Sequence, residues 1–600
     1  MIVERRPASK RKTGMLTFGR AWLDWGGGAI GGVRFCCMRS ARLSLLLLLP
    51  LAAVGCGSTD TSTPTGDGGV TPDAAGDSAS TDGGPLAAPG CPTVTSDPDV
   101  KQSLPTATVD TTLPTMTGKV VSVMAGGDLQ AAIDAAALGD TIELEAGATF
   151  TGAFTLPAKT GSGWIIIRTS APDGQLAMPG TRVSPALASK MAKLASKGLP
   201  VFSPAKGAHH YRLIGLEITA TAGTYVNSLV DLGVDTAAES ELAHDVIVDR
   251  CYLHADAVGG RRGVTLNSKS SAVIDSHLSG FREKGADSQA IVGWAGPGPF
   301  RIVNNYLEGA SENVMFGGAD PKIANLVPSD IQICGNHFRK DPTWIGQGWV
   351  AKNLLEFKNA RRVLVAGNVL ENSWSDGQVG FGILFTPRNQ DGTAPWSVDS
   401  DVTVAYNVLR HVGSGVNLSA SDDLNKSQPT TRIVIRDNLI DDVGGATFTG
   451  DGRVFQFTSG GGGGSDIKLD HNTAVSAKNA TLVLGDTAKY GTNFVFSNNV
   501  LARGQYGAFG SGQGEGTKAL DFYLVSYSFE NNALFGSAAP GTYPATTSLP
   551  ATASDVGFVD FAGGNYALAS SSTFAKAGSD GRDLGADFSV LVLATKNVAP

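Results

Sequence analysis

One short phrase returns eight times in the second half of the chain, and it limits what the chain can fold into. Each copy has alternating apolar residues, then a small or polar residue, an asparagine and further residues that are mostly apolar. The asparagines follow one another at spacings of 27 to 39 residues: Asn305, Asn336, Asn368, Asn407, Asn438, Asn472, Asn499 and Asn532. A period of about 20–50 residues indicates a repeat architecture.

The apolar residues of each phrase alternate, as Val363, Val365 and Val369 do, which predicts strands with one buried face. Helix-length amphipathic segments do not separate the copies, which disfavours βαβ units. We therefore predict an all-β solenoid of stacked coils with an asparagine corner, at which each side-chain amide bonds the equivalent amide one coil away. Corners at Gly215, Cys251 and Ser276 would lie outside this ladder. A β-sandwich with similar strands is the alternative.

The N-terminal sequence predicts a secretion signal. Arg39 and Arg42 precede the apolar run 43–54, which is too short to span a membrane. The stretch that ends at Cys56 (AVGC) resembles the lipobox of bacterial lipoproteins, which implies cleavage before Cys56 and lipidation of its thiol. We expect 1–56 to be this signal region, with Met38 as an alternative start, and the protein to be lipid-anchored at the cell envelope. An ordinary signal peptide is the alternative.

The remaining chain divides by composition. Residues 57–118 begin with a Ser/Thr/Gly/Asp/Pro-rich tract that cannot bury a core, so we predict a flexible tether. Residues 119–540 hold the repeats, and 541–600 differ from them and are predicted to close the far end. The mature cysteines are Cys91, Cys251 and Cys334, an odd number without a CxxC spacing. We expect no disulfide framework and a packed Cys334.

A helix over Leu129–Ala137, followed by a strand over Thr141–Glu145, is predicted to cover the first coil. The phrase GDTIELEAG, the asparagine corners and the tail FVDFAGGNYALASSS resemble secreted bacterial right-handed parallel β-helix proteins of the pectate-lyase-like class. The resemblance covers about residues 118–590. It implies a right-handed single-stranded parallel β-helix of three sheets with a short N-terminal capping helix. It also implies an extracellular polysaccharide ligand, most often an acidic one.

In that class, the strand that precedes each phrase lines a binding groove. If Leu355 and Phe357 point inward, Glu356 and Lys358 point outward together. The same alternation predicts an outward stripe on the neighbouring coils. Its members are Asn313 and Met315, Thr386 and Arg388, Asn417 and Ser419, and Gln456.

These residue types fit the cleavage of a uronate polymer by β-elimination. Such a lyase must neutralise the sugar carboxylate, remove the neighbouring proton and protonate the leaving oxygen. Alginate-lyase-like and chondroitinase-B-like β-helix enzymes are similar: they use Asn and Glu as Ca²⁺ ligands, a Lys base and an Arg acid. This implies Lys358 and Arg388 as catalytic residues, and Asn313 with Glu356 as metal ligands. Glu312 is a candidate second carboxylate, and Glu356, Asn417 and Gln456 are candidate sugar contacts. A surface pair of Glu356 with Lys358 is the alternative.

Other signals are weaker. Asp470-His471 echoes a pectate-lyase stretch without its arginine segment, and Asp422-Asp423 lacks the segments that accompany paired aspartates in polygalacturonases. His209-His210 is interpreted as a coil-edge pair rather than a metal site. The net charge of −8 and the lack of a basic run disfavour nucleic acid. We predict a monomeric lyase at the cell surface. A non-catalytic glycan-binding or scaffold protein and a glycoside hydrolase are the alternatives.

Overall fold

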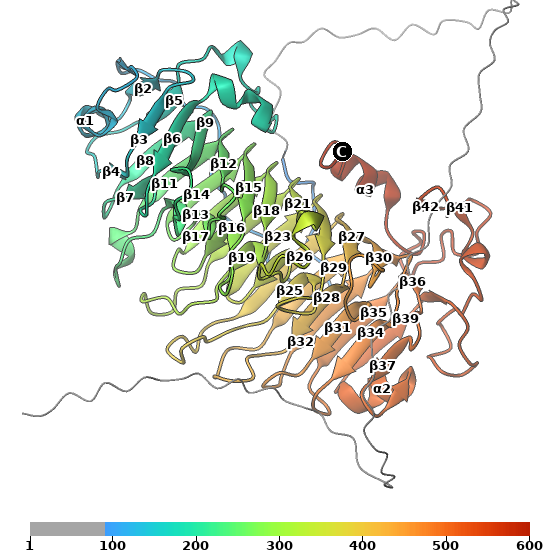
Figure 1. The fold of residues 1–600 in the computed structure, drawn as a ribbon. Coiled ribbons are helices and arrows are strands. Elements are labelled where there is room, and N and C mark those ends of the chain that lie inside the picture. The colour runs from blue at the N-terminus through green and yellow to red at the C-terminus, as the bar shows by residue number, and fades with distance from the viewer. Residues whose placement is uncertain (1–89) are drawn as a thin grey trace, which may run out of the picture. The chain divides into compact units, whose positions relative to one another are not determined.

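The computed structural model describes residues 90–600, and the predicted signal region with Cys56 lies outside them. Within that range the chain winds as a right-handed parallel β-helix, in which each coil gives one strand in turn to sheets A, B and C (Figure 1). The sheets have 14, 13 and 13 strands in the described part of the chain. The fold predicted from the repeated phrase is thereby confirmed.

The strands of sheet A are β1 (Val120–Val123), β2 (Thr141–Leu144), β5 (Ile165–Thr169), β8 (His209–Ile214), β11 (His244–Asp249), β14 (Lys269–Ile274), β17 (Gly298–Val303), β20 (Ser329–Cys334), β23 (Ala360–Ala366), β26 (Asp399–Ala405), β29 (Thr431–Arg436), β32 (Ser465–Asp470), β35 (Thr492–Ser497) and β39 (Tyr527–Glu530). The strands of sheet B are β3 (Thr149–Thr151), β6 (Ala192–Ser196), β9 (Leu216–Ala220), β12 (Tyr252–His254), β15 (His277–Phe281), β18 (Tyr306–Gly309), β21 (His337–Arg339), β24 (Val369–Ser373), β27 (Val408–Val412), β30 (Leu439–Val443), β33 (Thr473–Ala474), β36 (Val500–Ala502) and β40 (Ala533–Phe535).

The strands of sheet C are β4 (Phe154–Leu156), β7 (Phe202–Pro204), β10 (Ser228–Asp231), β13 (Arg262–Thr265), β16 (Gln289–Gly293), β19 (Glu312–Phe316), β22 (Leu355–Phe357), β25 (Phe381–Phe385), β28 (Ser414–Ser419), β31 (Arg453–Thr458), β34 (Ala480–Gly485), β37 (Ala508–Gly510) and β38 (Gly514–Glu515). Only β38 pairs antiparallel within these sheets, and β41 (Phe558–Asp560) and β42 (Asn565–Leu568) form a separate hairpin. The inward side chains of the three sheets make one continuous apolar core.

Two short helices pack at the two ends of this core. Helix α1 (Leu129–Ala135) buries Leu129 and Ile133 against the first coil, as predicted. Helix α2 (Thr517–Tyr523) buries Leu520 and Tyr523 in the same core near β37. Tyr543, from the segment 541–600 predicted to close this end, belongs to the same core and stacks on Phe529 at 5.7 Å, so α2 and this segment both contribute here.

The asparagine corner between sheets A and B forms the predicted ladder. In seven successive links, the Nδ2 of one asparagine donates to the Oδ1 of the next, at 2.9 to 3.1 Å, from Asn305 to Asn532. Two details differ from the prediction. The left-handed residue is the one before the asparagine, such as Tyr406 (φ 57°). Ser276 also joins the ladder, because its N–H donates to the Oδ1 of Asn305 and its Oγ accepts from the N–H of Cys251.

Residues 91–112, which we define as the N-terminal strap, are packed along the outer face of sheet A. Their contacts run backwards along the coils. Asp97 pairs with Lys468, Ser103 N donates to Asp401, Thr106 N donates to Asp330, and the Thr112 carbonyl accepts from Arg212. A disulfide joins Cys91 to Cys334. The prediction of a flexible tether is therefore wrong for the strap, and the expectation of an unbridged Cys334 is also wrong. The partner, Cys91, lies in a segment whose composition suggested no packing.

Residues 578–598, which we define as the C-terminal return, also run backwards, over the ladder corner. The N–H of Gly585 donates to the carbonyl of Asn498, and Arg582 forms an ion pair with Asp437. The carbonyl of Val598 accepts from Arg182, which lies in the 170–191 loop. Helix α3 (Phe588–Ala594) lies in this segment (Figure 1). The N-terminal strap and the C-terminal return thereby shield the corner from water. Within residues 90–600, none of the helices is long and apolar enough to cross a membrane.

Candidate functional site

The predicted pair Glu356 and Lys358 lies on the outer face of sheet C, on β22. Leu354 and Leu355 both belong to the core, so the alternation slips by one residue just before Glu356. Asn353 consequently lies on the outer side with Glu356, and its Nδ2 is 3.3 Å from Glu356 Oε2. Lys358 Nζ lies 3.4 Å from Glu356 Oε1, and the Glu356 side chain is only 1% exposed.

The same slip determines which side chains of the neighbouring coil point inward and which point outward. Val314 aligns with Leu355, and the N–H of Asn313 donates to the carbonyl of Leu354. Asn313 therefore occupies the inward position, and Glu312 the outward one. The prediction that Asn313 belongs to the outward stripe is wrong, because it assumed strict alternation. Glu312, which we considered as a second carboxylate, is the residue that shares the face of Glu356.

Glu312 is fully buried and has one neutral partner, Gln289, whose Nε2 donates to Oε2 at 2.7 Å. Its other oxygen lacks a hydrogen bond, and the nearest cation is Lys352 Nζ at 4.0 Å. Burial, together with the charges of Glu356 and Asp287, raises the pKa of Glu312 to about 8. Burial works against the charge of Lys358, but the surrounding carboxylates raise the pKa of this lysine overall. Glu312 therefore holds its proton to a higher pH than an ordinary carboxyl group does, and it lies beside a Glu356 that is paired with Lys358.

A third carboxylate, Asp399 at the start of β26, completes the group. The backbone N–H groups of Thr386 and Ala360 that face it donate to other carbonyls, and neither of its oxygens has a hydrogen bond. Burial first, and the charge of Glu356 second, raise the pKa of Asp399 well above its ordinary value. Nothing in the sequence singles out Asp399, because it resembles any polar residue that opens a strand. We call Glu312, Glu356 and Asp399 the carboxyl cluster.

The proposed Ca²⁺ ligands do not fit that ion. Asn313 Oδ1 accepts from the buried Nζ of Lys340 at 3.1 Å, while its Nδ2 donates to the carbonyls of Leu307 and Arg339. The same Nζ donates to the carbonyls of Gly309, Ser311 and Asn353. An oxygen cage that could attract a hard cation is thus occupied by a lysine. Glu356 is likewise paired with Lys358, so we derive no step through calcium.

Arg388 and the two remaining sugar-contact candidates lie apart from the cluster. The backbone N–H of Arg388 donates to the Lys358 carbonyl at 2.8 Å, but its guanidinium pairs with Asp422 at 2.7 Å and Asp423 at 2.9 Å. Gln456 donates to Asn417 at 2.7 Å, one coil apart. The coil between Asn417 and Glu356 presents Leu384 at the aligned position. The predicted polar stripe is therefore interrupted, because the register aligns Leu384, and not Thr386, with Glu356.

A pocket of about 300 Å³ lies further along the same sheet. Its lining includes Trp294, Asp231 and Asn267, and the guanidinium of Arg262 lies over the Trp294 ring at 5.3 Å. Trp294, Gly317 and Lys358 each follow aligned residues of three neighbouring coils. Only a glycine therefore separates the aromatic pocket from the ammonium of Lys358. An aromatic ring with polar groups around it is the usual make-up of a small-molecule pocket.

Comparisons with known proteins do not assign the chain to a family. No family model matches the chain, and no curated protein matches it. Among solved structures, the catalytic unit of a GH87 α-1,3-glucanase from Streptomyces thermodiastaticus is 14% identical, with a TM-score of 0.45, over 72% of this chain and 71% of that one. The PL6 family alginate lyase AlyGC is 14% identical, with a TM-score of 0.39, over 72% of this chain and 53% of that one. Pectate lyase Pel9A is 13% identical, with a TM-score of 0.29, over 78% and 96%.

Proposed function

We propose that the protein cleaves a polysaccharide bound across the outer face of sheet C, with Glu312 as the proton donor. The observation that supports this is the contrast between two neighbouring carboxyl groups: burial raises the pKa of Glu312 to about 8, whereas Glu356 pairs with the ammonium of Lys358 at 3.4 Å. Two carboxyl groups whose surroundings separate their pKa values can divide acid and base work between them. The alternative of a surface pair of Glu356 with Lys358 does not account for a Glu356 side chain that is only 1% exposed.

Hydrolysis is the reaction that this pair supports best. Because Glu312 is fully buried and Glu356 is 1% exposed, the side chains over them must move aside when the glycan binds. Glu312 then gives its proton to the glycosidic oxygen as the bond to the sugar carbon breaks, and Glu356 takes a proton from the attacking water. Water supplies the new hydroxyl, and solvent returns the two carboxyl groups to their starting states. Lys358, whose raised pKa keeps it an ammonium, stabilises the charge of Glu356 rather than acting as the base.

Elimination is the second candidate, and the position of Lys358 favours it. Its side chain is 15% exposed, so an ammonium is offered to a sugar carboxylate that enters this face. Neutralising a uronate in this way makes the proton on the neighbouring carbon more acidic. Glu356 would remove that proton, and Glu312 would protonate the leaving oxygen as the double bond forms. The substrate would then be an acidic glycan.

A panel of pectate, alginate, glycosaminoglycans and neutral glucans tests both reactions with the full chain. New reducing ends without ultraviolet absorbance indicate hydrolysis, and reducing ends with the absorbance of an unsaturated sugar indicate elimination. Binding of a glycan without any new reducing ends would instead support the non-catalytic scaffold.

The role of Glu312 is tested by Glu312→Gln, which keeps its shape and removes its proton. We expect the rate of cleavage to fall by a factor of about 10²–10⁴, the range typical of lost acid catalysis. Glu530→Gln, an exposed carboxylate on β39, is the matched control and should keep full activity. An active Glu312→Gln variant would assign the reaction to other residues.

We also propose that the protein is held at the bacterial cell envelope by a lipid on Cys56. The supporting observation is the AVGC stretch after the apolar run. In the Cys56→Ser variant the protein should move from the membrane fraction to the soluble fraction after ultracentrifugation. Membrane association that persists in this variant would exclude the anchor.

A further inference from the structure

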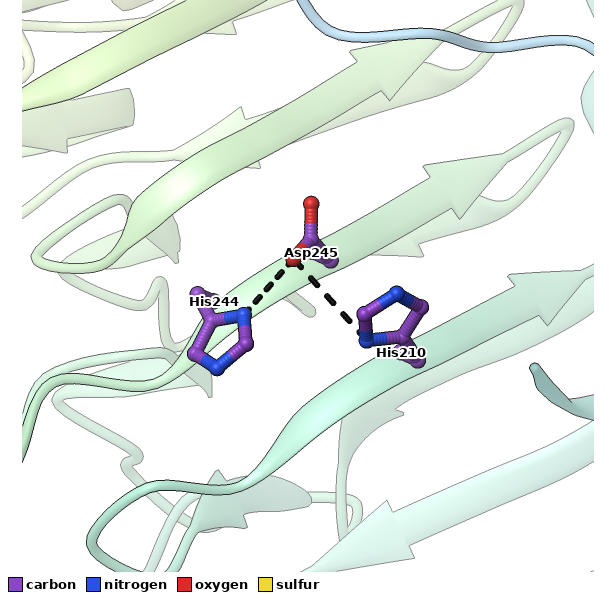
Figure 2. Close-up of side chains that lie close together, drawn as sticks. All are labelled: His210, His244 and Asp245. Atoms are coloured by element: carbon purple, nitrogen blue, oxygen red, sulfur yellow. Dashed lines mark hydrogen bonds and ion pairs between the residues drawn. The ribbon is translucent and has the colours of Figure 1, made fainter. Parts of the chain in front are cut away.

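A cluster of histidines lies on sheet A, away from the carboxyl cluster. It is formed by β8 and β11, which are neighbours in the sheet, with His209 and His244 in register. Figure 2 shows His210, His244 and Asp245 of this cluster. These residues contain the one His/Asp group among residues 90–600 whose donor atoms converge closely enough for a metal ion. Our sequence interpretation of His209-His210 as a mere coil-edge pair considered only one strand and missed the second.

The backbone explains why so many donors meet here. Alternation along a strand would send neighbouring side chains to opposite faces. His210 (φ 59°) and Asp245 (φ 53°) have left-handed backbones, which break the alternation at the same place in both strands. His209 and His210 therefore both project outward, as do His244 and Asp245. Two stacked coils thus present a square of three imidazoles and one carboxylate.

The distances within the square fit one small cation. Asp245 Oδ2 lies 2.6 Å from His244 Nδ1 and 3.9 Å from His210 Nδ1, and the three donor atoms lie within 4.8 Å of one another. Donors of a tetrahedral zinc ion are about 3.3 Å apart, given bond lengths of about 2.0–2.1 Å. Shifts of less than about 1 Å in exposed side chains would bring the observed separations to that value.

Neighbouring groups already orient the donors. Ser270 Oγ donates to Asp245 Oδ1 at 2.7 Å, which leaves Oδ2 to face the imidazoles. His209 Nε2 lies 2.9 Å from the Lys159 carbonyl, and a carbonyl can only accept. Nε2 of His209 therefore carries the hydrogen, and its Nδ1 in the neutral ring is bare, 2.8 Å from His210 Nδ1. A cation that displaces the proton between these two nitrogens gains a further donor.

We propose that His210, His244 and Asp245, with His209 beside them, bind a divalent transition-metal cation, for which Zn²⁺ is the best match. Imidazole nitrogens with one carboxylate oxygen favour zinc, copper or nickel over the hard ions calcium and magnesium. The side chains are 28% to 36% exposed, so the ion can enter from solvent and keep a water ligand. The bound ion would link two adjacent coils near the N-terminal end of the solenoid.

The test uses the full chain purified without a polyhistidine tag and stripped with a chelator. Zn²⁺ titrated into it calorimetrically should bind at one site per chain, and the midpoint of thermal unfolding should rise with the Zn²⁺ concentration. Co²⁺ in place of Zn²⁺ should give the visible absorption of a nitrogen- and oxygen-ligated ion. The fluorescence of Trp164, whose ring lies 5.0 Å from that of His210, should change in the same titration.

His244→Gln and, separately, Asp245→Asn should lower the affinity for Zn²⁺ at least tenfold. The matched control is His411→Gln, because His411 also pairs with an aspartate, Asp442, at 2.8 Å but belongs to no converging group of metal donors within residues 90–600. Unchanged circular dichroism in the absence of metal verifies that each variant is folded. The proposal is overturned if the wild type shows no saturable binding, or if folded His244→Gln and Asp245→Asn bind Zn²⁺ as tightly as the wild type.

Discussion

The asparagine ladder and the carboxyl cluster both bury their polar groups, but the groups of the ladder are hydrogen-bonded and several of those in the cluster are not. In the ladder, each interior asparagine donates to the next asparagine and to a backbone carbonyl, and accepts from the one before. In the cluster, one oxygen of Glu312 and both oxygens of Asp399 lack any hydrogen bond. Within residues 90–600, none of the buried side-chain atoms without a partner belongs to a ladder asparagine.

The difference shows which polar burial supports the fold. A repeated corner can satisfy every amide because each coil supplies the donor that its neighbour needs. Three carboxyl groups on adjacent coils have no such complement, and they stay buried only by holding protons or by pairing with Lys358. Unsatisfied buried groups cost free energy, so the ladder stabilises the solenoid while the cluster costs stability and gains reactivity.

The largest expected contrast is in stability. Asn368→Ala removes an amide that donates to the Ile333 carbonyl and to Asn407, and it takes away one of the two acceptors of the Asn336 amide. The free energy of unfolding should fall by about 1–3 kcal/mol, measured by guanidinium denaturation. Asn438→Ala should behave alike. Glu312→Gln should leave stability unchanged or raise it, because it removes a buried acid from beside Glu356.

The exposed asparagine Asn565 supplies the control for that contrast, since Asn565→Ala removes an amide of the same type from the surface. Its midpoint should match the wild type. If Asn368→Ala and Asn438→Ala denature at the wild-type midpoint, the ladder does not carry the stability assigned to it. If Glu312→Gln loses as much stability as the two asparagine variants, the carboxyl cluster does not cost stability and the proposed contrast with the ladder is wrong.

A second, smaller contrast is in the pH dependence of stability. The pKa of Glu312 is about 8 in the folded chain, above its ordinary value of 4.5. Below 4.5 both states hold the proton, so this contribution to stability is fully present. Between 4.5 and about 8 only the unfolded state releases the proton, so the free energy of unfolding falls, by on the order of 1 kcal/mol per pH unit at most. Above about 8 it changes no further.

The measurement is a set of denaturation curves at pH values across that window. The free energy of unfolding of the wild type minus that of Glu312→Gln should fall as the pH rises through the window. The same difference taken with Asn368→Ala should not change with pH, because an amide does not titrate. A flat difference for Glu312→Gln would mean that Glu312 is ionised at neutral pH, and Glu312 could then not act as the proton donor.

The solenoid and its ladder could be predicted from the sequence because both repeat. A side-chain period of two and an asparagine at the corner are local patterns, and both are repeated in each of these coils. The N-terminal strap could not be predicted in this way. Its contacts, such as Ser103 with Asp401 and the disulfide of Cys91 with Cys334, join residues hundreds of positions apart and occur once each.

The site was predicted in part. Glu356 and Lys358 were found because two charged residues flank Phe357 in an otherwise apolar strand. Asn313 was misplaced because the slip at Leu354 and Leu355 is a property of the backbone that alternation alone does not reveal. The register that places Leu384 beside Glu356 is likewise set by loop lengths, which vary from coil to coil.

The smallest expected effect comes from lengthening the ladder by one member. Ser276 already stands at the next corner, where its Oγ accepts from the N–H of Cys251 at 3.0 Å. In Ser276→Asn, the new Oδ1 would take over that bond. The new Nδ2 would reach the carbonyl of Val248, the residue aligned with Val273, to which Asn305 donates now. One gained bond against the loss of a small hydroxyl should raise the free energy of unfolding by no more than about 1 kcal/mol. The exposed Ser570→Asn serves as the control, and calorimetric melting measures both. A clear loss of stability in Ser276→Asn would show that the corner at Cys251 is packed too tightly for an asparagine, and that the ladder ends at Ser276 for reasons of volume rather than hydrogen bonding.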